Sequence, residues 1–208
     1  MNRIHLLVIL LLAVVAVPFA AADTIQLTNN NLGISGSIGT VNLTQQGGNV
    51  LVTLQANAGY SFKLGNGQDI LFNTSATGWS ITNIKIDGTA FLGSFGLSNA
   101  ATRAGYTFAY DLSGLSNGNA SAEKISFVMT GITVAQLEQT FTNPHNGHVN
   151  PFFWGVHFCV GGGTGCGTGN TGFAQGNSPA AVPEPGTLSL LGTGIVGIAS
   201  FMRHRFLA

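Results

Sequence analysis

Residues 41–54 read VNLTQQGGNVLVTL, two short runs of alternating apolar and polar residues on either side of a glycine pair. Alternation with a period of two is the pattern of a β-strand that buries one face. In the second run, the buried face would carry Val50, Val52 and Leu54. Gly47 and Gly48, followed by Asn49, favour a turn between the runs. The stretch therefore predicts two strands joined by a turn.

The same alternation recurs on both sides of this stretch. It is found at residues 24–28, 60–64, 84–86, 105–112, 124–130 and 152–160. Asp87-Gly88 follows one of these segments and suits a tight hairpin turn, because glycine accepts a positive φ. Many short strands without a long helical pattern predict an all-β body, an antiparallel β-sandwich of the jelly-roll-like or Ig-like kind. At most one or two short helices are expected within this body.

One segment of the body has helical spacing. Val134, Leu137 and Phe141 would share one face of a two-turn helix over residues 133–141, and Thr133 could cap its first turn. A continued strand is the alternative, because Thr133 and Val134 are β-branched.

The first residues have the features of a secretory signal peptide. Residues 1–5 include one arginine and no acidic residue, residues 6–17 are continuously apolar, and small residues follow. Ala20 and Ala22 stand at the spacing that signal peptidase requires, which predicts a signal helix over residues 1–22 with cleavage after Ala22.

Charge is scarce in this chain of 208 residues, of which only 7% are charged and 30 are glycine. Between the two termini, residues 23–181 contain four basic and six acidic residues, a net charge of −2. A body without a basic patch cannot neutralise phosphates, which excludes nucleic acid as a partner. Residues 23–171 are expected to form one domain, and the Gly/Asn/Ser-rich residues 172–181 a linker.

The last 27 residues combine three signals in a fixed order. Val182, Pro183, Glu184 and Pro185 form an extended segment, because each proline fixes its own φ and disfavours helix before it. Residues 186–202 are uncharged and would span roughly 25 Å as a transmembrane helix. Arg203 and Arg205 follow as a basic stop that resists translocation.

This tail, residues 182–208, resembles the PEP-CTERM sorting signal of exported bacterial proteins. The resemblance implies recognition and cleavage by an exosortase, transient anchoring in the inner membrane, and a place at the cell surface or outside the cell. It also implies an association with exopolysaccharide production and biofilm formation. A plain C-terminal membrane anchor, with Pro-Glu-Pro as a linker, is the alternative reading of the same residues.

Cys159 and Cys166 are the only cysteines, and the four glycines between them allow a small loop to close. In an exported chain this pair predicts a disulfide. Two free thiols or a metal pair are the alternatives, but with His157 the set offers only three of the four ligands that zinc prefers.

The remaining candidates for chemistry are weak. His145 and His148 lie in a polar turn cluster after Glu138, and Asp69, Asp87 and Asp111 are expected near turns without the dense acidic loop of a calcium site. Residues 167–172 match the glycine spacing of dinucleotide-binding loops, but no helix follows them to bind a phosphate. We therefore predict no catalytic, metal-binding or cofactor-binding residue.

Two functions fit these observations. The first is a non-enzymatic surface or matrix protein that an exosortase processes. The second is a secreted glycan-binding or glycan-hydrolysing β-sandwich protein, in which Tyr60, Trp79 or Trp154 would stack on sugars and two carboxylates would face one cleft.

Overall fold

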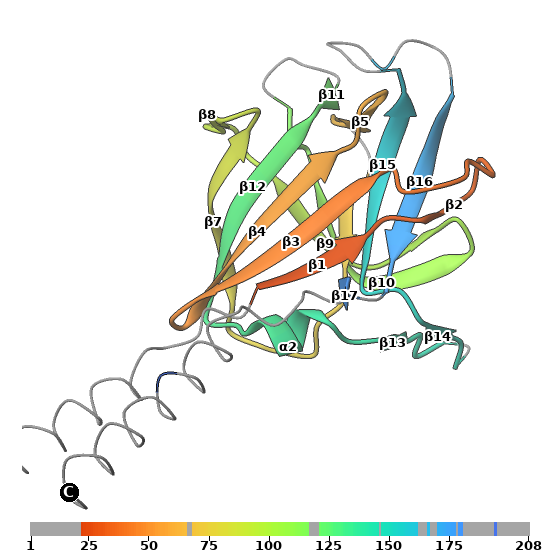
Figure 1. Ribbon diagram of the computed structural model, residues 1–208. Coiled ribbons are helices and arrows are strands. Elements are labelled where there is room, and N and C mark those ends of the chain that lie inside the picture. Colours follow the sequence, from red (N-terminus) through yellow and green to blue (C-terminus); the bar gives the residue numbers. More distant parts are fainter. Residues whose placement is uncertain are drawn as a thin grey trace, which may run out of the picture.

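The computed structural model describes residues 22–65, 68–116, 121–145, 147–161, 166, 170–177, 179–180 and 194. Its strands pair in antiparallel fashion, and the only helix in the body, within the described residues, is a single turn. This confirms the prediction of an all-β, antiparallel body (Figure 1). No helix in the described part of the chain is long and apolar enough to cross a membrane.

The described strands form two main sheets. The first, called sheet A here, lies in front in Figure 1 and has the strand order β17-β1-β3-β4-β12-β7-β8. Its strands are β1 (Ala22–Gln26), β3 (Gly39–Gln46), β4 (Asn49–Ala56), β7 (Ser80–Ile86), β8 (Thr89–Ala90), β12 (Lys124–Thr130) and β17 (Pro179–Ala180). The opening stretch of sequence supplies β3 and β4, which pair from Gly39 opposite Ala56 to Gln46 opposite Asn49.

The second sheet, sheet B, is organised around β15. Strand β16 pairs with one edge of β15, while β6 and β5 pair with successive halves of the other edge. Its strands are β2 (Asn29–Asn30), β5 (Tyr60–Lys63), β6 (Gln68–Phe72), β9 (Gly96–Arg103), β10 (Tyr106–Ser113), β11 (Ser121–Ala122), β15 (Trp154–Val160) and β16 (Thr171–Gly176). A separate small pair consists of β13 (Phe141–Thr142) and β14 (Val149–Asn150).

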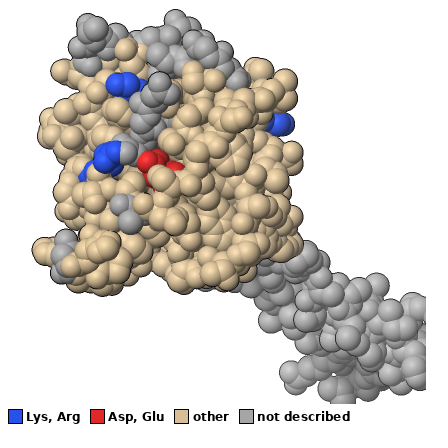
Figure 2. Space-filling view, turned by 180° about the vertical axis from the view of Figure 1, so that it is seen from behind, with Lys and Arg blue, Asp and Glu red and all other residues tan. Residues whose placement is uncertain are grey.

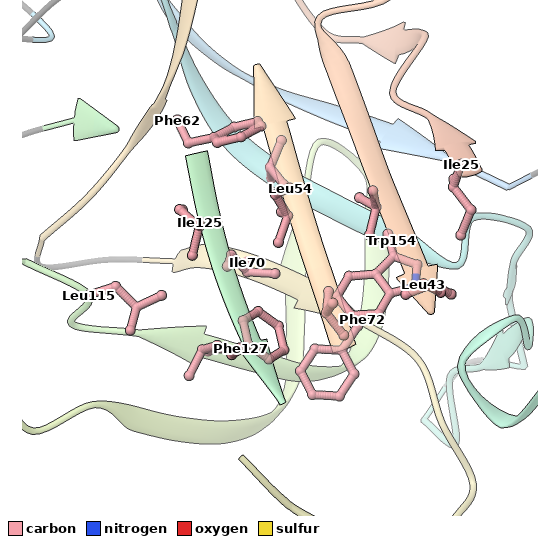
Figure 3. Close-up of a cluster of buried hydrophobic side chains, with 14 of the residues drawn as sticks. Ile25, Leu43, Leu54, Phe62, Ile70, Phe72, Leu115, Ile125, Phe127 and Trp154 are labelled. Atoms are coloured by element: carbon pink, nitrogen blue, oxygen red, sulfur yellow. The ribbon is translucent and has the colours of Figure 1, made fainter. Parts of the chain in front are cut away.

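The hydrophobic core lies between the two sheets. Figure 3 shows inward side chains of sheet A, such as Leu54 and Phe127, facing Ile70 and Trp154 of sheet B. The apolar residues that alternation assigned to the inner face of β4 are fully buried, because a strand directs every second side chain to the same side. Aromatic rings fill the centre of this core, with Phe72 and Trp154 stacked at a centroid distance of 5.3 Å.

Turn chemistry sets the register of two hairpins as predicted. Gly47, with a φ of 61°, links β3 to β4. Asp87 and Gly88 have φ values of 48° and 82° and connect β7 to β8 by a two-residue turn. Turns of this kind need a positive φ at both central residues, which aspartate tolerates and glycine adopts without steric cost.

The predicted helix over residues 133–141 is shorter in the structure. Helix α2 (Val134–Leu137) is one turn long, and Phe141 belongs to β13 instead. Thr133 is the N-cap residue, as predicted, and the side-chain Oε1 of Gln136 accepts hydrogen bonds from its backbone N–H and its hydroxyl. Val134 and Leu137 anchor the turn in the core, and no further apolar residue at helical spacing is buried there to extend it.

The predicted linker over residues 172–181 is wrong in its first half. Residues 172–176 belong to β16, which pairs with β15 along its whole length, and Ala174 is fully buried in the core. Small residues are required here: a Cβ on Gly176 would lie 2.3 Å from the carbonyl oxygen of Gln26. The glycine-rich composition therefore reflects close backbone packing and not a flexible connection.

Candidate functional site

The sorting signal joins the body at the edge of sheet A. Strand β17 pairs with β1, with Ala180 opposite Thr24 and Pro179 opposite Ile25. Ala22, where signal cleavage is predicted, is the first residue of β1. The two processing points are thus connected to neighbouring strands at one edge of the body (Figure 1).

Most residues of the two predicted processing signals lie outside the described residues. These are Ala20 of the signal-cleavage site, Val182, Pro183, Glu184 and Pro185 of the sorting signal, and Arg203 and Arg205 of the basic stop. The structure therefore positions the strands that lead to these signals, while the predictions for the signals themselves, including the transmembrane helix, remain predictions.

The predicted disulfide is present. Cys159, which is buried near the end of β15, is bonded to Cys166, and their Cα atoms are 5.5 Å apart. Strand β16 begins five residues after Cys166, so the bond closes the connection between two paired strands of sheet B. In the chain-entropy description a loop of this size stabilises the fold by roughly 2.5 kcal/mol.

Asp111 does not lie near a turn, contrary to the sequence prediction. It occupies the interior of β10, between Leu71 of β6 and Ser98 of β9, and only 3% of its surface is exposed. Burial raises its pKa from the ordinary 3.8 to about 6, although the positive charge of Arg103 acts in the opposite direction. Its Oδ1 atom has no hydrogen-bond partner in the structure described here.

We predict that Asp111→Asn stabilises the protein above pH 6. Folding raises the pKa of this carboxyl group, so the folded state is penalised when the group is ionised and not when it is protonated. The free energy of unfolding should rise by about 2 kcal/mol at pH 7.5, and the gain should vanish as the pH approaches 4.

Urea unfolding of the wild type and the Asp111→Asn variant at both pH values measures this difference. Glu123→Gln, at an exposed carboxylate, is the matched control and should change stability by less than about 0.5 kcal/mol at either pH. An Asp111→Asn effect of equal size at pH 4 and pH 7.5 would contradict the assigned cause.

The histidines are not assembled into a site. His157, on β15, stacks on Phe173 of β16 at a centroid distance of 4.5 Å, and burial, with Lys63 and Arg103 nearby, lowers its pKa to about 4. His145 and His148 are exposed in the connection between β13 and β14. Among the described residues, no group of three histidine, cysteine or acidic side chains could hold a metal ion.

Glu138 lies just after α2, close to the start of sheet A. Burial raises its pKa to about 7, and the negative charge of Asp23 on β1 adds to this shift. Its Oε1 atom is buried without a hydrogen-bond partner in the described structure. This carboxyl group therefore neighbours the first strand of the body and not the two exposed histidines with which the sequence associated it.

The aromatic residues considered for sugar stacking serve mainly to pack the core. Trp154 has no exposed surface, and its indole N–H donates to the carbonyl of Leu137 at 3.2 Å. Trp79 and Tyr60 are half-buried against the same core, and the ring of Trp79 contacts Tyr110 edge-on at 4.9 Å. Trp154 is therefore excluded as a surface that a sugar could stack on.

The surface of the described residues includes two hollows. The larger, about 500 Å³, lies on the outer side of sheet A over β4, β12, β7 and β8, and is called the sheet A groove here. The smaller, about 300 Å³, lies between the β9–β10 turn and β14. The sheet A groove is lined by Leu51, Thr53, Asn83, Ile84, Lys85, Ala90, Lys124, Ser126 and Val128.

Sequence reasoning did not identify the sheet A groove. Its residues come from strands far apart in the chain, and most of them are outward-facing positions that alternation marks only as polar or exposed. The available signal was indirect: Lys85 and Lys124 are two of only four basic residues between the termini. The opposite side of the molecule, seen in Figure 2, is mostly uncharged and has basic and acidic side chains together in one area.

Comparison with known proteins identifies the tail and leaves the body without a counterpart. The family model described as the PEP-CTERM protein-sorting motif matches residues 181–205, which begin directly after β17. No curated protein and no solved structure matches the chain. The chain therefore carries a PEP-CTERM sorting motif, which implies exosortase-dependent export, and this motif follows the strand at the edge of sheet A.

Proposed function

We propose that the protein is exported, held transiently in the inner membrane by residues 186–202, and cleaved near Pro183-Glu184-Pro185 by an exosortase. Its β-sandwich body then acts at the cell surface or in the extracellular matrix as a non-enzymatic protein associated with exopolysaccharide and biofilm. The match of the sorting motif to residues 181–205 is the observation that carries this proposal.

The short connection between β17 and the sorting signal limits how far the folded body can be from the exosortase during cleavage. Ala180 is the last residue of β17, and Glu184 follows four residues later. Four residues span at most about 14 Å, so the exosortase meets its recognition segment while the folded body is close to the membrane surface. The sorting enzyme must therefore accommodate the edge of sheet A, or β17 must separate from β1 first.

The body has the properties expected of a protein that works outside the cell. It contains a disulfide between Cys159 and Cys166, and disulfides form and persist in oxidising compartments outside the cytosol. The association with exopolysaccharide comes from the resemblance of the tail to signals of this class.

Glycan hydrolysis is less well supported than binding. Hydrolysis needs two carboxyl groups on either side of a bound sugar. Neither the sheet A groove nor the smaller hollow beside β14 is lined by an aspartate or a glutamate. These two hollows therefore offer no pair of carboxyl groups for hydrolysis, whereas the sheet A groove offers side chains for binding.

Mass spectrometry of both ends of the exported protein tests the proposal. In cells with the exosortase, we expect an N-terminus at Asp23 and a C-terminus within or near residues 183–185. In cells that lack the enzyme, the N-terminus should be unchanged while the chain extends to Ala208. An intact C-terminus at Ala208 in the presence of the exosortase would show that the tail is only an anchor.

A further inference from the structure

The floor of the sheet A groove is defined by strand register. Leu51 of β4 lies opposite Val128 of β12, and the next outward pair along the same strands is Thr53 opposite Ser126. On its other side, Ser126 lies opposite Lys85 of β7. The groove therefore has an aliphatic half and a polar half, both presented by the outer face of one sheet.

A β-bulge shapes the wall of this groove. Along β7, Lys85 pairs with Ser126 while Thr82 pairs with Val128, so Asn83 and Ile84 together face a single residue of β12. Asn83 has a φ of 53°, a left-handed conformation that few non-glycine residues adopt. Bulges increase strand twist and are frequent beside functional sites, where they redirect side chains. Here the redirected side chain, Asn83, lines the groove.

Two lysines lie at the polar end of the groove. Lys124 precedes Ser126 by two residues, so it projects from the same face of β12. Lys85 and Lys124 thus occupy diagonal positions on neighbouring strands, where residues are about 7–8 Å apart. An anion bound between these strands could interact with both side chains.

No described residue supplies that anion. Neither lysine forms an ion pair with another described residue, and no acidic side chain lines the groove. Asp87, the nearest acid in register, uses its Oδ1 atom to accept hydrogen bonds from the backbone N–H groups of Glu123 and Lys124, at 3.0 and 2.8 Å. Glu123 itself is exposed beside the groove and is not part of its lining.

The hydroxyl and amide side chains that line the groove also have no hydrogen-bond partner among the described residues. The side chains of Thr53, Ser126 and Asn83 make no hydrogen bond to any other described residue. The groove thus offers two cationic donors, two hydroxyls and one amide beside an aliphatic floor. A carboxylate would satisfy the lysines, ring hydroxyls would pair with the polar side chains, and the C–H face of a sugar would cover Leu51 and Val128.

We propose that the sheet A groove binds an acidic oligosaccharide, a chain of sugars with carboxylate groups, with Lys85 and Lys124 holding one carboxylate. An inorganic anion would use the lysines but leave the aliphatic floor uncovered, whereas a neutral sugar would supply no negative charge to either lysine. This inference rests on the proposed association with exopolysaccharide and names the chemical class and the residues of contact.

Isothermal titration of the purified, exported protein with oligogalacturonate tests this assignment. Lys85→Gln and Lys124→Gln should each weaken binding by about tenfold, since each removes one charge-assisted hydrogen bond. Lys63→Gln, which removes the same charge from sheet B, is the matched control and should bind as the wild type does. Thr53→Val should weaken binding while leaving both charges in place.

The competitors decide which ligand class the groove recognises. Neutral dextran oligosaccharides should not bind, and polyglutamate should bind more weakly than oligogalacturonate at equal charge. No binding of oligogalacturonate, equal binding of polyglutamate, or equal loss of binding in Lys63→Gln and Lys85→Gln would each overturn the assignment. Because the ends of the purified protein are determined beforehand by mass spectrometry, a failure of binding is distinguishable from a failure of exosortase processing.

Discussion

Replacement of Glu184 by alanine should slow exosortase processing by one to two orders of magnitude, so that the full-length chain accumulates in the inner membrane. The physical reason lies in the Pro183-Glu184-Pro185 segment. Its two prolines fix two φ angles, so little backbone entropy is lost when an enzyme binds it, and Glu184 supplies the one charge that can orient it. Loss of a charge-assisted contact in an enzyme site costs about 1.5–3 kcal/mol, enough to slow cleavage by one to two orders of magnitude.

Membrane fractionation and immunoblotting of exported protein measure this effect. The alanine variant should retain its apolar segment, residues 186–202, and therefore stay in the membrane fraction instead of being released. Glu123→Ala, which removes an exposed carboxylate from the body, is the control and should be processed like the wild type. If the Glu184→Ala protein loses its tail at the wild-type rate, the tripeptide is not the recognition element and the plain-anchor reading is favoured.

Replacement of Trp154 by alanine should be the most damaging single change in the body, with a loss of about 3–5 kcal/mol in the free energy of unfolding. Trp154 has no exposed surface and stacks on Phe72 at the centre of the core. Its indole N–H also donates to the carbonyl of Leu137, the last residue of α2, so the variant loses both a packed ring and the hydrogen bond that ties this turn to the core.

Trp154→Phe separates these two contributions. It keeps an aromatic ring against Phe72 but leaves the carbonyl of Leu137 without its donor, and it should cost less than the alanine change. Chemical denaturation of both variants beside the wild type provides the comparison. A Trp154→Ala protein with wild-type stability and impaired oligogalacturonate binding would indicate a ligand-binding role, contrary to the core position described above.

Local patterns were sufficient to predict many of the strands, although not β9 or β16, and two of the hairpin turns. A strand directs alternate side chains to opposite faces, so Val50, Val52 and Leu54 identify a buried face without any knowledge of its partner. Asp87-Gly88 likewise predicts its turn, because the backbone conformation needed there depends on two residues only. The sorting motif belongs to the same category, since all its signals are contiguous within residues 181–205.

Composition was misleading at positions where strands remote in sequence determine which side chain fits. Residues 172–176 looked like a linker because they are rich in small residues, yet those residues allow β16 to lie against β15 and close to β1. Asp111 looked like an exposed turn residue, yet β6 and β9 flank it and bury its carboxyl group. In both cases the environment is made by strands that are remote in sequence.

The sequence by itself therefore determined the class of fold, the hairpin turns, the disulfide and the sorting motif, because each depends on neighbouring residues or on a contiguous pattern. Only the tertiary structure decided which strands pair, which polar groups are buried, and that Lys85 and Lys124 share one groove. Strand pairing joins residues separated by up to about 150 positions, as between β1 and β17, and is selected by the packing of the whole core. The groove exists because β4, β7 and β12 become neighbours in sheet A, a relation that no local stretch of residues encodes.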